Sequence, residues 1–305
     1  MKIDVQLFMQ TKMIYLLVAL FFISASYKGQ RHEIGLQMGM SNLVGDIGRT
    51  NYVLQRPVLS NIADYGIPFY GAILYRMNFN PYQTVRLNIG YSQIQFIDAL
   101  AKEQYRRNRK LSGTNSIVEA DLIFEYNFFP VNDEQKSLLS PYIFGGVGAM
   151  LASAPQLIVE NDFRRDTAGN PIYPTTAEDF IPRSTYAMGK KLTMAIPFGV
   201  GLKYKFNYNW ALFGEFMFRP TFSDSIDYSM IDENSVKIKY NKEFLAAGSS
   251  TKSLLQEDPY KTIAEARVAK LLEDRQIGNI NSKDWVNTIS LGLSYSFGRP
   301  PCYCD

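Results

Sequence analysis

The chain has 305 residues, 46% hydrophobic and 14% aromatic, and a formal net charge of +3 from 32 basic and 29 acidic residues. So small an excess of positive charge provides no broad basic surface, which argues against a nucleic-acid-binding protein. A single histidine, His32, and two cysteines exclude most histidine-dependent catalysis and most zinc sites. Both cysteines lie at the C-terminal end, so they do not staple the fold internally.

The N-terminal segment has the layout of a secretory signal peptide. Lys12 precedes ten apolar residues at 14–23, and the small residues 24–26 follow. Ten apolar residues are too few to span a bilayer as a helix, and no later apolar run approaches about 18 residues. We therefore expect a signal peptide over residues 1–26, with cleavage as late as Gln30 and a start at Met9 or Met13 as alternatives, and no transmembrane helix in the mature chain.

Segments of about ten residues that alternate apolar with small or polar residues recur from Arg31 onward. Side chains of a strand point alternately to its two faces, so each segment predicts a strand with one apolar and one polar face. Eight such strands are expected, at 32–42, 68–78, 84–93, 116–129, 141–151, 192–206, 209–222 and 285–297.

The intervals between these strands alternate in length. The long ones lie at about 43–67, 94–115, 152–191 and 223–284. Outer-membrane barrels combine short periplasmic turns with long extracellular loops, and an even number of strands puts both termini on one side. We therefore predict an all-β fold, an eight-stranded antiparallel transmembrane β-barrel over 32–297. It would lie in the cell outer membrane with short periplasmic turns, long extracellular loops and both termini in the periplasm.

A secreted β-sandwich is the main alternative, because it also alternates polar and apolar residues. Its strands are usually shorter, about 5–6 residues, and its polar face would form the exterior. Strands of 10–14 residues with bulky apolar faces fit a tilted membrane strand better. A sandwich also leaves four long polar loops at one end without an explanation.

A helix is predicted inside the last long interval. Asp258 and Pro259 precede the segment TIAEARVAKLLEDRQ, and Gly278 follows it. Asp and Pro before a helix and Gly after it are typical of helix ends. The apolar stripe is modest, so we favour a helix that packs on its own loop over one that docks on a partner.

Charged side chains on the polar faces are expected to point into the barrel. The lumen of an eight-stranded barrel is just wide enough for side chains to fill, and buried charge is costly unless it is paired. A salt-bridged plug is therefore favoured over a channel or a general-acid pair. The predicted interior residues are Glu119, Asp121, Glu125, Glu215, Arg86, Arg219, Lys203 and Lys205, with Arg76 as a further cationic partner.

No catalytic, metal or cofactor motif can be assembled from the sequence. The glycines of Gly145-Gly146-x-Gly148 lie inside a strand pattern with no helix after them, which favours a bend or close-packed point of the wall over a phosphate loop. His32 begins the first strand, at the predicted periplasmic end, away from the outer rim where lipid-modifying barrels need catalytic residues. We expect no enzyme; a transport or adhesion barrel acting through its long loops is the alternative.

Five stretches carry a family resemblance: 32–48, 126–130, 141–151, 197–206 and 284–305. They read HEIGLQMGMSNLVGDIG, YNFFP, PYIFGGVGAML, PFGVGLKYKF and DWVNTISLGLSYSFGRPPCYCD. Together they resemble the PorG-like family, outer-membrane barrels of the type IX secretion system of Bacteroidetes. The Gly-Asp pair of the first stretch and the cysteine-bearing tail of the last are the discriminating parts, and PorT-like barrels of the same system are the near competitor.

The resemblance implies a non-enzymatic role in protein export and, in gliding species, in motility. PorG-like proteins associate, at the inner leaflet of the outer membrane, with a periplasmic ring of PorK-like lipoprotein and PorN-like subunits. The chain would tether or position that ring. Outer-membrane lipid and other outer-membrane secretion components are further candidate partners.

The tail at 298–305 contains both cysteines after Pro300 and Pro301, which favour an extended chain. In an extended chain, Cys302 and Cys304 lie about 6.5–7 Å apart at Cα, at or beyond the limit for an internal disulfide. Two ligands are too few for a structural zinc site. Such thiols favour an intermolecular disulfide in an oxidising compartment, with a strained or reduced pair as the alternative. The resemblance makes the ring lipoprotein the candidate partner.

Overall fold

The computed structural model describes residues 31–50, 65–132, 138–172, 181–240, 245, 248, 250–279 and 281–298. The predicted signal peptide lies outside these residues, and so do Cys302 and Cys304. Among the described residues, none of the helices combines the length and hydropathy that a membrane-crossing helix requires.

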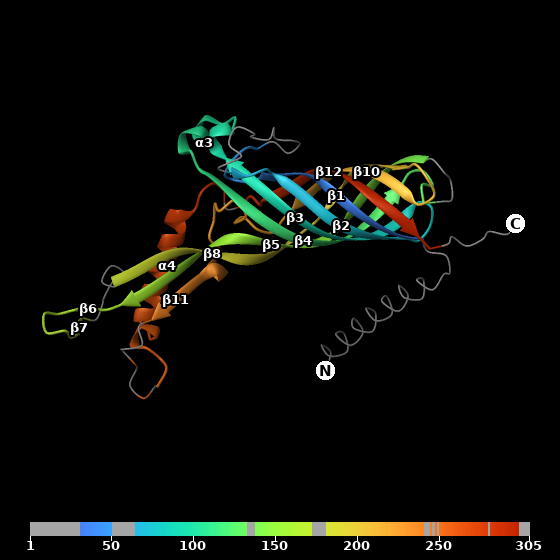
Figure 1. Cartoon of the computed structure of the whole chain (residues 1–305). Coiled ribbons are helices and arrows are strands. Elements are labelled where there is room, and N and C mark those ends of the chain that lie inside the picture. The colour runs from blue at the N-terminus through green and yellow to red at the C-terminus, as the bar shows by residue number, and fades with distance from the viewer. Residues whose placement is uncertain are drawn as a thin grey trace, which may run out of the picture.

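The described strands close into an antiparallel barrel (Figure 1). In chain order the barrel strands are β1 (Arg31–Val44), β2 (Phe69–Asn78), β3 (Gln83–Ile97), β4 (Ser112–Asn127), β5 (Leu138–Asp162), β8 and β9 (Ile181–Ala195 and Phe198–Lys205), β10 (Trp210–Pro220) and β12 (Trp285–Phe297). β8 and β9 together form one barrel strand, because both pair with β5 on either side of a break. The pairing of β1 with β12 closes the ring, and the predicted eight-stranded barrel is confirmed.

The break between β8 and β9 falls at Ile196 and Pro197, and proline has no N–H to donate to a ladder. The amide of Gly146 donates to Pro197 O at 2.8 Å. A Cβ on Gly146 would lie 2.1 Å from Leu122 O, so only glycine allows this approach of the strands. The glycine cluster of β5 therefore lies where the barrel wall is close-packed.

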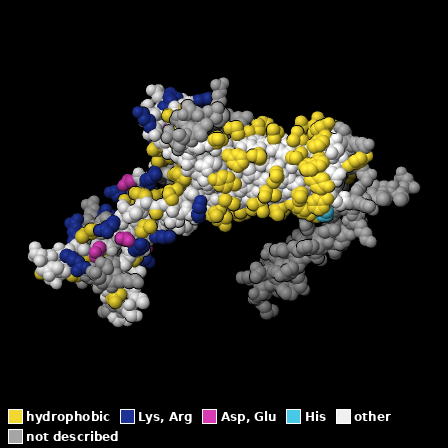
Figure 2. Space-filling view, viewed as in Figure 1, with side chains coloured by type: hydrophobic (Ala, Val, Ile, Leu, Met, Phe, Trp, Pro, Cys, Tyr) yellow, Lys and Arg dark blue, Asp and Glu magenta, His cyan; other side chains and the backbone are white. Residues whose placement is uncertain are grey.

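Apolar side chains cover the outside of the barrel and polar side chains fill the inside. On β4, Val118, Leu122 and Phe124 are 46–53% exposed, whereas Glu119 and Glu125 are 1% exposed. Figure 2 shows hydrophobic side chains along the visible face of the barrel wall. An apolar exterior around a polar interior is the arrangement of a membrane barrel and the reverse of a soluble sandwich.

The two ends of the barrel differ. One, here called the turn end, has the short connections, such as 79–82 and 206–209, and the register pair His32 and Phe297. The other, the loop end, has the long connections (Figure 1, left of the barrel). The chain therefore enters β1 and leaves β12 at the turn end.

The long intervals contain more secondary structure than the sequence indicates. The interval between β3 and β4 contains η2 (Asp98–Leu100) and α3 (Gln104–Arg109). β5 and β8 continue beyond the barrel as a paired ribbon, with β6 (Arg164–Arg165) and β7 (Pro171–Ile172) at its tip. The prediction of a loop across about 152–191 is thus wrong at both ends, because β5 reaches Asp162 and β8 begins at Ile181.

The last long interval builds a second layer on this ribbon. It contains η3 (Glu233–Ser235), β11 (Val236–Tyr240), η4 (Leu254–Gln256) and α4 (Tyr260–Arg275). β11 pairs with β5 in parallel, which gives a three-stranded sheet, β8–β5–β11, here called the extension. Val268 of α4 packs with Leu157, Val159 and Ile231. The predicted helix is confirmed, and it covers β5 as well as its own loop (Figure 1).

Candidate functional site: the barrel lumen and the loop-end carboxylates

A buried ion pair lies nearest the turn end of the lumen. Lys203 of β9 donates to both oxygens of Glu33 on β1, at 2.8 and 3.0 Å. Asn78 Nδ2 donates to Glu33 at 2.9 Å, and Lys203 also donates to Asn132 Oδ1 at 3.1 Å. Because Glu33 and Lys203 are almost fully buried, both charges require compensation, and Arg76 Nη1 also lies 3.9 Å from Glu33 Oε2.

Two carboxylates and two guanidinium groups form the centre of the network. Arg76 Nε donates to both oxygens of Glu125, at 3.0 and 3.1 Å, and Arg86 Nη1 lies 2.9 Å from Glu125 Oε1. Arg86 also donates to Glu215, and Arg76 Nη2 reaches Glu215 Oε1 at 3.4 Å. Two positive and two negative groups from four different strands therefore balance one another across the lumen.

Glu215 accepts hydrogen bonds from four different side chains. Tyr142 Oη donates to its Oε1 at 2.5 Å, and Gln37 Nε2 donates to its Oε2 at 2.8 Å. Gln37 Nε2 also donates to Ser290 Oγ at 2.6 Å. Both oxygens of Glu215 are thus satisfied, which is the condition under which a buried carboxylate is tolerated.

A third ion pair lies nearer the loop end. Arg219 of β10 donates to Glu119 of β4 through Nη1 and to Val286 O through Nε at 3.2 Å. The guanidinium also lies 5.2 Å from the ring centre of Tyr70, a cation–π arrangement. Beyond this layer, apolar side chains fill the barrel at the loop end, including Leu43, Ile94 and Met150.

All eight predicted interior residues lie buried in the barrel. Six of them take part in the ion pairs described above: Glu119, Glu125, Glu215, Arg86, Arg219 and Lys203. Asp121 lies against β5, where a Cβ on Gly148 would be 2.0 Å from its Oδ1, and Lys205 is 3% exposed on β9.

Glu33, Gln37 and Tyr142 belong to the network but were not among the predicted residues, whereas Arg76 lies inside the barrel as expected. Glu33, Gln37 and Arg76 lie on the polar faces of their strands, so the alternation provided a usable signal. The sequence gave no such signal for Tyr142, because a tyrosine in a membrane strand can face either the lumen or the membrane interface. The alternation along the strands indicates which polar side chains lie inside the barrel, but it does not indicate which partner each of them has.

His32, the single histidine, lies at the turn end of β1, where it was expected. Its ring stacks beside Tyr75 at 5.9 Å and lies 5.7 Å from Phe297, measured between ring centres. Tyr75 Oη is 2.7 Å from His32 Nδ1. These contacts join the first, second and last strands of the barrel, which is a structural role.

A second group of buried carboxylates lies at the loop end. Asp227 accepts the amides of Ile47 at 2.8 Å and Ser229 at 2.9 Å, and Asp284 accepts the amide of Ile226 at 2.8 Å. A Cβ on Gly45 would lie 2.4 Å from Asp284 Oδ1 and 2.6 Å from Asp227 Oδ2. The two carboxylates therefore converge in the space that glycine leaves open.

Two further aspartates surround this pair. Asp46 Oδ2 accepts the amide of Asn279 at 3.1 Å and the hydroxyl of Ser282 at 3.0 Å, and Asp224 is 2% exposed. Burial, together with the charges of Asp46 and Asp227, raises the pKa of Asp224 to about 7. Burial and the nearby Asp227 also raise the pKa of Asp284. Within the described residues, no three His, Cys, Asp or Glu side chains are arranged to hold a metal ion.

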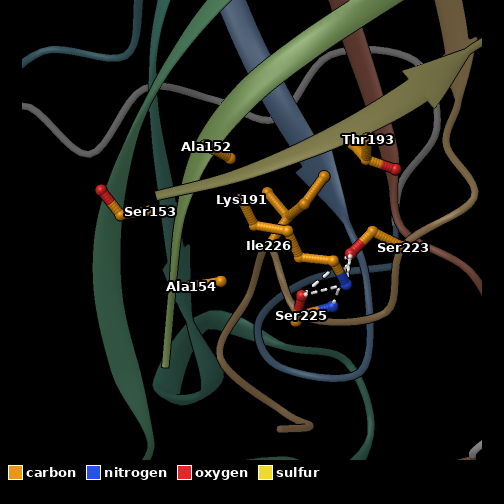
Figure 3. A pocket seen from close by; sticks show the side chains of 8 residues that line it. All are labelled: Ala152, Ser153, Ala154, Lys191, Thr193, Ser223, Ser225 and Ile226. Carbon is orange, nitrogen blue, oxygen red and sulfur yellow. Dashed lines mark hydrogen bonds between the residues drawn. The ribbon is translucent and has the colours of Figure 1, made fainter. Parts of the chain in front are cut away.

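A small pocket lies beside these aspartates, between the ribbon and the last long interval. It is lined by Ala152, Ser153, Ala154, Lys191, Thr193, Ser223, Ser225 and Ile226. Figure 3 shows Lys191 directed at Ser223 and Ser225, whose hydroxyls accept from Nζ at 3.1 and 3.2 Å. Lys191 also forms an ion pair with Asp232. Lys191 therefore links the ribbon to the last long interval.

A closed antiparallel barrel, with an apolar belt outside and a charged, filled lumen inside, defines a small outer-membrane β-barrel protein. The chain belongs to the DUF6089 family, described as a domain of unknown function, whose model matches residues 11–172 and 267–305. No curated protein matches the sequence.

Solved structures with a similar fold include several outer-membrane proteins. Ail of Yersinia pestis, in complex with the heparin analogue sucrose octasulfate, is 12% identical, with a TM-score of 0.37 over 88% of this chain and 99% of that chain. Neisserial surface protein A is 11% identical, with a TM-score of 0.32 over 88% and 98%. A major outer membrane protein of Thermus thermophilus is 13% identical, with a TM-score of 0.34 over 88% and 99%.

Proposed function

We propose that this protein is a non-enzymatic outer-membrane component of a type IX secretion machine. In this role it tethers or positions a periplasmic ring of PorK-like and PorN-like subunits. The observation that carries the proposal is the closed lumen, which is crossed by the Arg76, Arg86, Glu125 and Glu215 network and filled with apolar side chains above it. A barrel filled in this way offers solutes no path, so its work is done at its ends and outer surface.

The turn end favours a partner on the periplasmic side. Short turns of outer-membrane barrels face the periplasm, and Phe297 ends β12 at the turn end, beside His32. A tail that starts at Gly298 therefore begins where a periplasmic ring would be met. The sequence resemblance to PorG-like barrels supplies the identity of that ring, and Cys302 and Cys304 supply thiols for a covalent link.

The proposal is tested with Cys302→Ser, Cys304→Ser and the double variant in a deletion strain. Envelope fractions and purified rings are run on non-reducing and reducing gels. We expect a higher-mass band that contains this chain and a ring subunit, that disappears on reduction, and that is lost in at least the double variant. Export of many substrates should fall in the deletion strain. Lys239→Gln, an exposed change in the extension, is the matched control and should change neither readout.

Two results would overturn the proposal together. They are free thiols at both positions in native envelopes and the absence of the chain from purified rings. A deletion strain with normal export would be equally decisive.

A second candidate function, ligand binding or adhesion outside the cell, is favoured by the extension. β5, β8, β11 and α4 form a packed layer beyond the barrel, with a hydrophobic core of its own around Leu157 and Val268. Removal of residues 223–284 would abolish surface binding if this function held. Under the secretion proposal, the same truncation leaves the disulfide-linked band in place.

A further inference from the structure

We propose that the outward face of β8 beyond the barrel binds the headgroup layer of the membrane. The proposed contact row consists of Tyr186, Met188 and Lys190, with Lys190 directed to lipid phosphate groups. The row would hold the extension against the bilayer surface. The inference rests on the membrane-spanning barrel and is independent of the partner at the turn end.

The row continues the lipid-facing belt without interruption. Leu192 and Met194 are 69% and 59% exposed and pair with Leu151 and Ala149 of the barrel wall. Side chains two residues apart on a strand share a face. Lys190, Met188 and Tyr186 therefore point to the same side as these membrane-facing residues.

The packed layer of the extension leaves this row uncovered. Tyr186 is the register partner of Leu157, yet Leu157 is fully buried in the cluster that Val268 of α4 completes, whereas Tyr186 is 52% exposed. Met188 pairs with Pro155 and is 56% exposed. The helix thus covers the outward face of β5 and stops short of β8.

The backbone of β8 limits how deep the row can lie. One edge of β8 pairs with β5 along its whole length. On the other edge, the described residues provide an isolated bridge from Ala195 to Thr221 and a bond from Phe222 N to Met194 O, but no ladder over 181–193. Unpaired backbone groups do not enter the hydrocarbon layer. The hydrocarbon boundary must therefore fall near Leu192 and Met194, which leaves the row at the level of the headgroups.

The residue types of the row are suited to the headgroup layer of the membrane. Lys190 Nζ donates one hydrogen bond to Ser153 Oγ at 3.0 Å, and an ammonium has two more hydrogens to donate. A lysine between apolar neighbours buries its stem and keeps its charge in the polar layer, and tyrosine prefers the same interface. Figure 2 shows Lys and Arg side chains where the hydrophobic belt meets the extension. A row from one strand is too narrow for a stable protein interface, which favours lipid as the occupant.

The test uses the full chain with Cys302→Ser and Cys304→Ser, reconstituted in phosphatidylcholine vesicles that contain phosphatidylglycerol. A fluorophore is attached at Met188→Cys, and quenching by spin labels at the lipid headgroup or deep in the acyl chain is compared. We expect the headgroup label to quench position 188 several-fold more than the deep label. Thr185→Cys is the matched control, because Thr185 is exposed on the opposite face of β8, and it should be quenched weakly by both. A heat-dependent shift in gel mobility checks that each variant is folded.

Equal quenching at positions 188 and 185 would overturn the proposal. Lys190→Gln tests the phosphate contact separately. We expect phosphatidylglycerol to raise headgroup quenching at position 188 about twofold to fivefold when Lys190 is present, because a lysine at an anionic surface enriches such lipids. The enrichment should disappear in Lys190→Gln; if it persists, Lys190 is not the phosphate ligand.

Discussion

The lumen and the loop end both bury carboxylates, but they compensate the negative charge in different ways. In the lumen, Glu125 and Glu215 face Arg76 and Arg86, and each carboxylate has a cation within hydrogen-bond distance. At the loop end, Asp227 and Asp284 face each other near Gly45, and the partners that they hold at short range are backbone amides. The central lumen network is balanced by opposite charge, whereas this group of loop-end aspartates accumulates like charge. Asp98, another buried carboxylate of the loop end, is paired with Arg109.

The difference follows from what each region connects. Neighbouring barrel strands offer Arg and Lys from several directions, so charge pairs can tie strands distant in the sequence to one another. At the loop end, the aspartates hold three separate segments by accepting their amide hydrogens, through Ile47, Ile226 and Asn279. Charge pairing suits a permanent plug, whereas amide binding by crowded carboxylates makes the loop end sensitive to pH.

The largest effect is expected from Glu215→Gln in the lumen. The change removes one of two central carboxylates and leaves Arg76 and Arg86 to share Glu125. Removing one partner of a buried charge pair costs about 3–5 kcal/mol, and we expect the free energy of unfolding to fall by that amount. Urea unfolding of the barrel in detergent micelles, followed by tryptophan fluorescence, measures it.

Glu265→Gln is the matched control, because Glu265 is an exposed residue of α4 that pairs with Lys261 at 3.7 Å. The control should change the free energy of unfolding by less than about 0.5 kcal/mol. A loss below 1 kcal/mol for Glu215→Gln, on the order of a surface substitution, would show that the central network does not hold the barrel together.

A somewhat smaller effect is expected for the coupling between Arg219 and Glu119. The pair is buried, so each single change, Arg219→Gln or Glu119→Gln, leaves a charge without its partner. The double variant should be more stable than the sum of the two losses predicts, with a coupling energy of about 2 kcal/mol. A double-mutant cycle of urea unfolding measures the coupling. Additive losses would mean that the tyrosine ring and the carbonyl near Arg219 compensate its charge without Glu119.

The barrel was predictable from the sequence because apolar and polar residues alternate regularly along its strands. Alternation on β4, with Glu119 and Glu125 inside and Leu122 and Phe124 outside, fixes which face meets lipid. The alternating interval lengths then indicate an even number of strands and two unlike ends. Asp258, Pro259 and Gly278 likewise indicated where α4 lies: the helix begins directly after Pro259 and ends before Gly278, although its N-cap, Pro259, makes no side-chain cap hydrogen bond.

The extension and the loop-end site were not predictable in the same way. Beyond Leu151 the outward residues of β5 become Ser153 and Pro155, so the lipid pattern stops although the strand continues. This part of β5 remains a strand because it pairs with β8 and β11, and β11 lies far away in the sequence. Asp227 and Asp284 are ordinary loop residues in the sequence, and only the fold shows that they converge on Gly45.

The contrast between the two regions predicts how the loop end responds to pH. A buried Asp whose pKa is raised in the folded state stays protonated while the unfolded chain loses its proton. The loop end is therefore most stable in acid and loses stability as pH rises from the ordinary aspartate value, about 4, toward the pKa of Asp224, about 7. Within this pH range, each such group lowers the free energy of unfolding by about 1.4 kcal/mol per pH unit. Hydrogen exchange of the Ile47, Ile226 and Ser229 amides, corrected for intrinsic rates, measures it.

Asp284→Asn sharpens this expectation, because it removes one carboxylate from the pair but keeps an oxygen to accept the Ile226 amide. At pH 8 the variant should protect the loop-end amides more than the natural chain does, by about 1–2 kcal/mol, and at pH 4 the two should be alike. Asp284→Asn is therefore expected to stabilise the protein at pH 8, whereas Glu215→Gln is expected to destabilise it. Protection that rises with pH in the natural chain would show that the aspartates are compensated at the loop end as they are in the lumen.

The smallest effect is expected for Lys239→Gln in the extension, where a charge pair is present but exposed. Lys239 Nζ lies 3.2 Å from Glu160 Oε1, and both side chains are about half exposed. Water screens such a pair, so its loss should lower the free energy of unfolding by about 0.2–1 kcal/mol, and high salt should remove most of the difference. Urea unfolding at low and high salt measures both. A loss as large as that of Glu215→Gln would mean that burial does not set the strength of the charge pairs, and the distinction between the lumen and the solvent-exposed extension would fail.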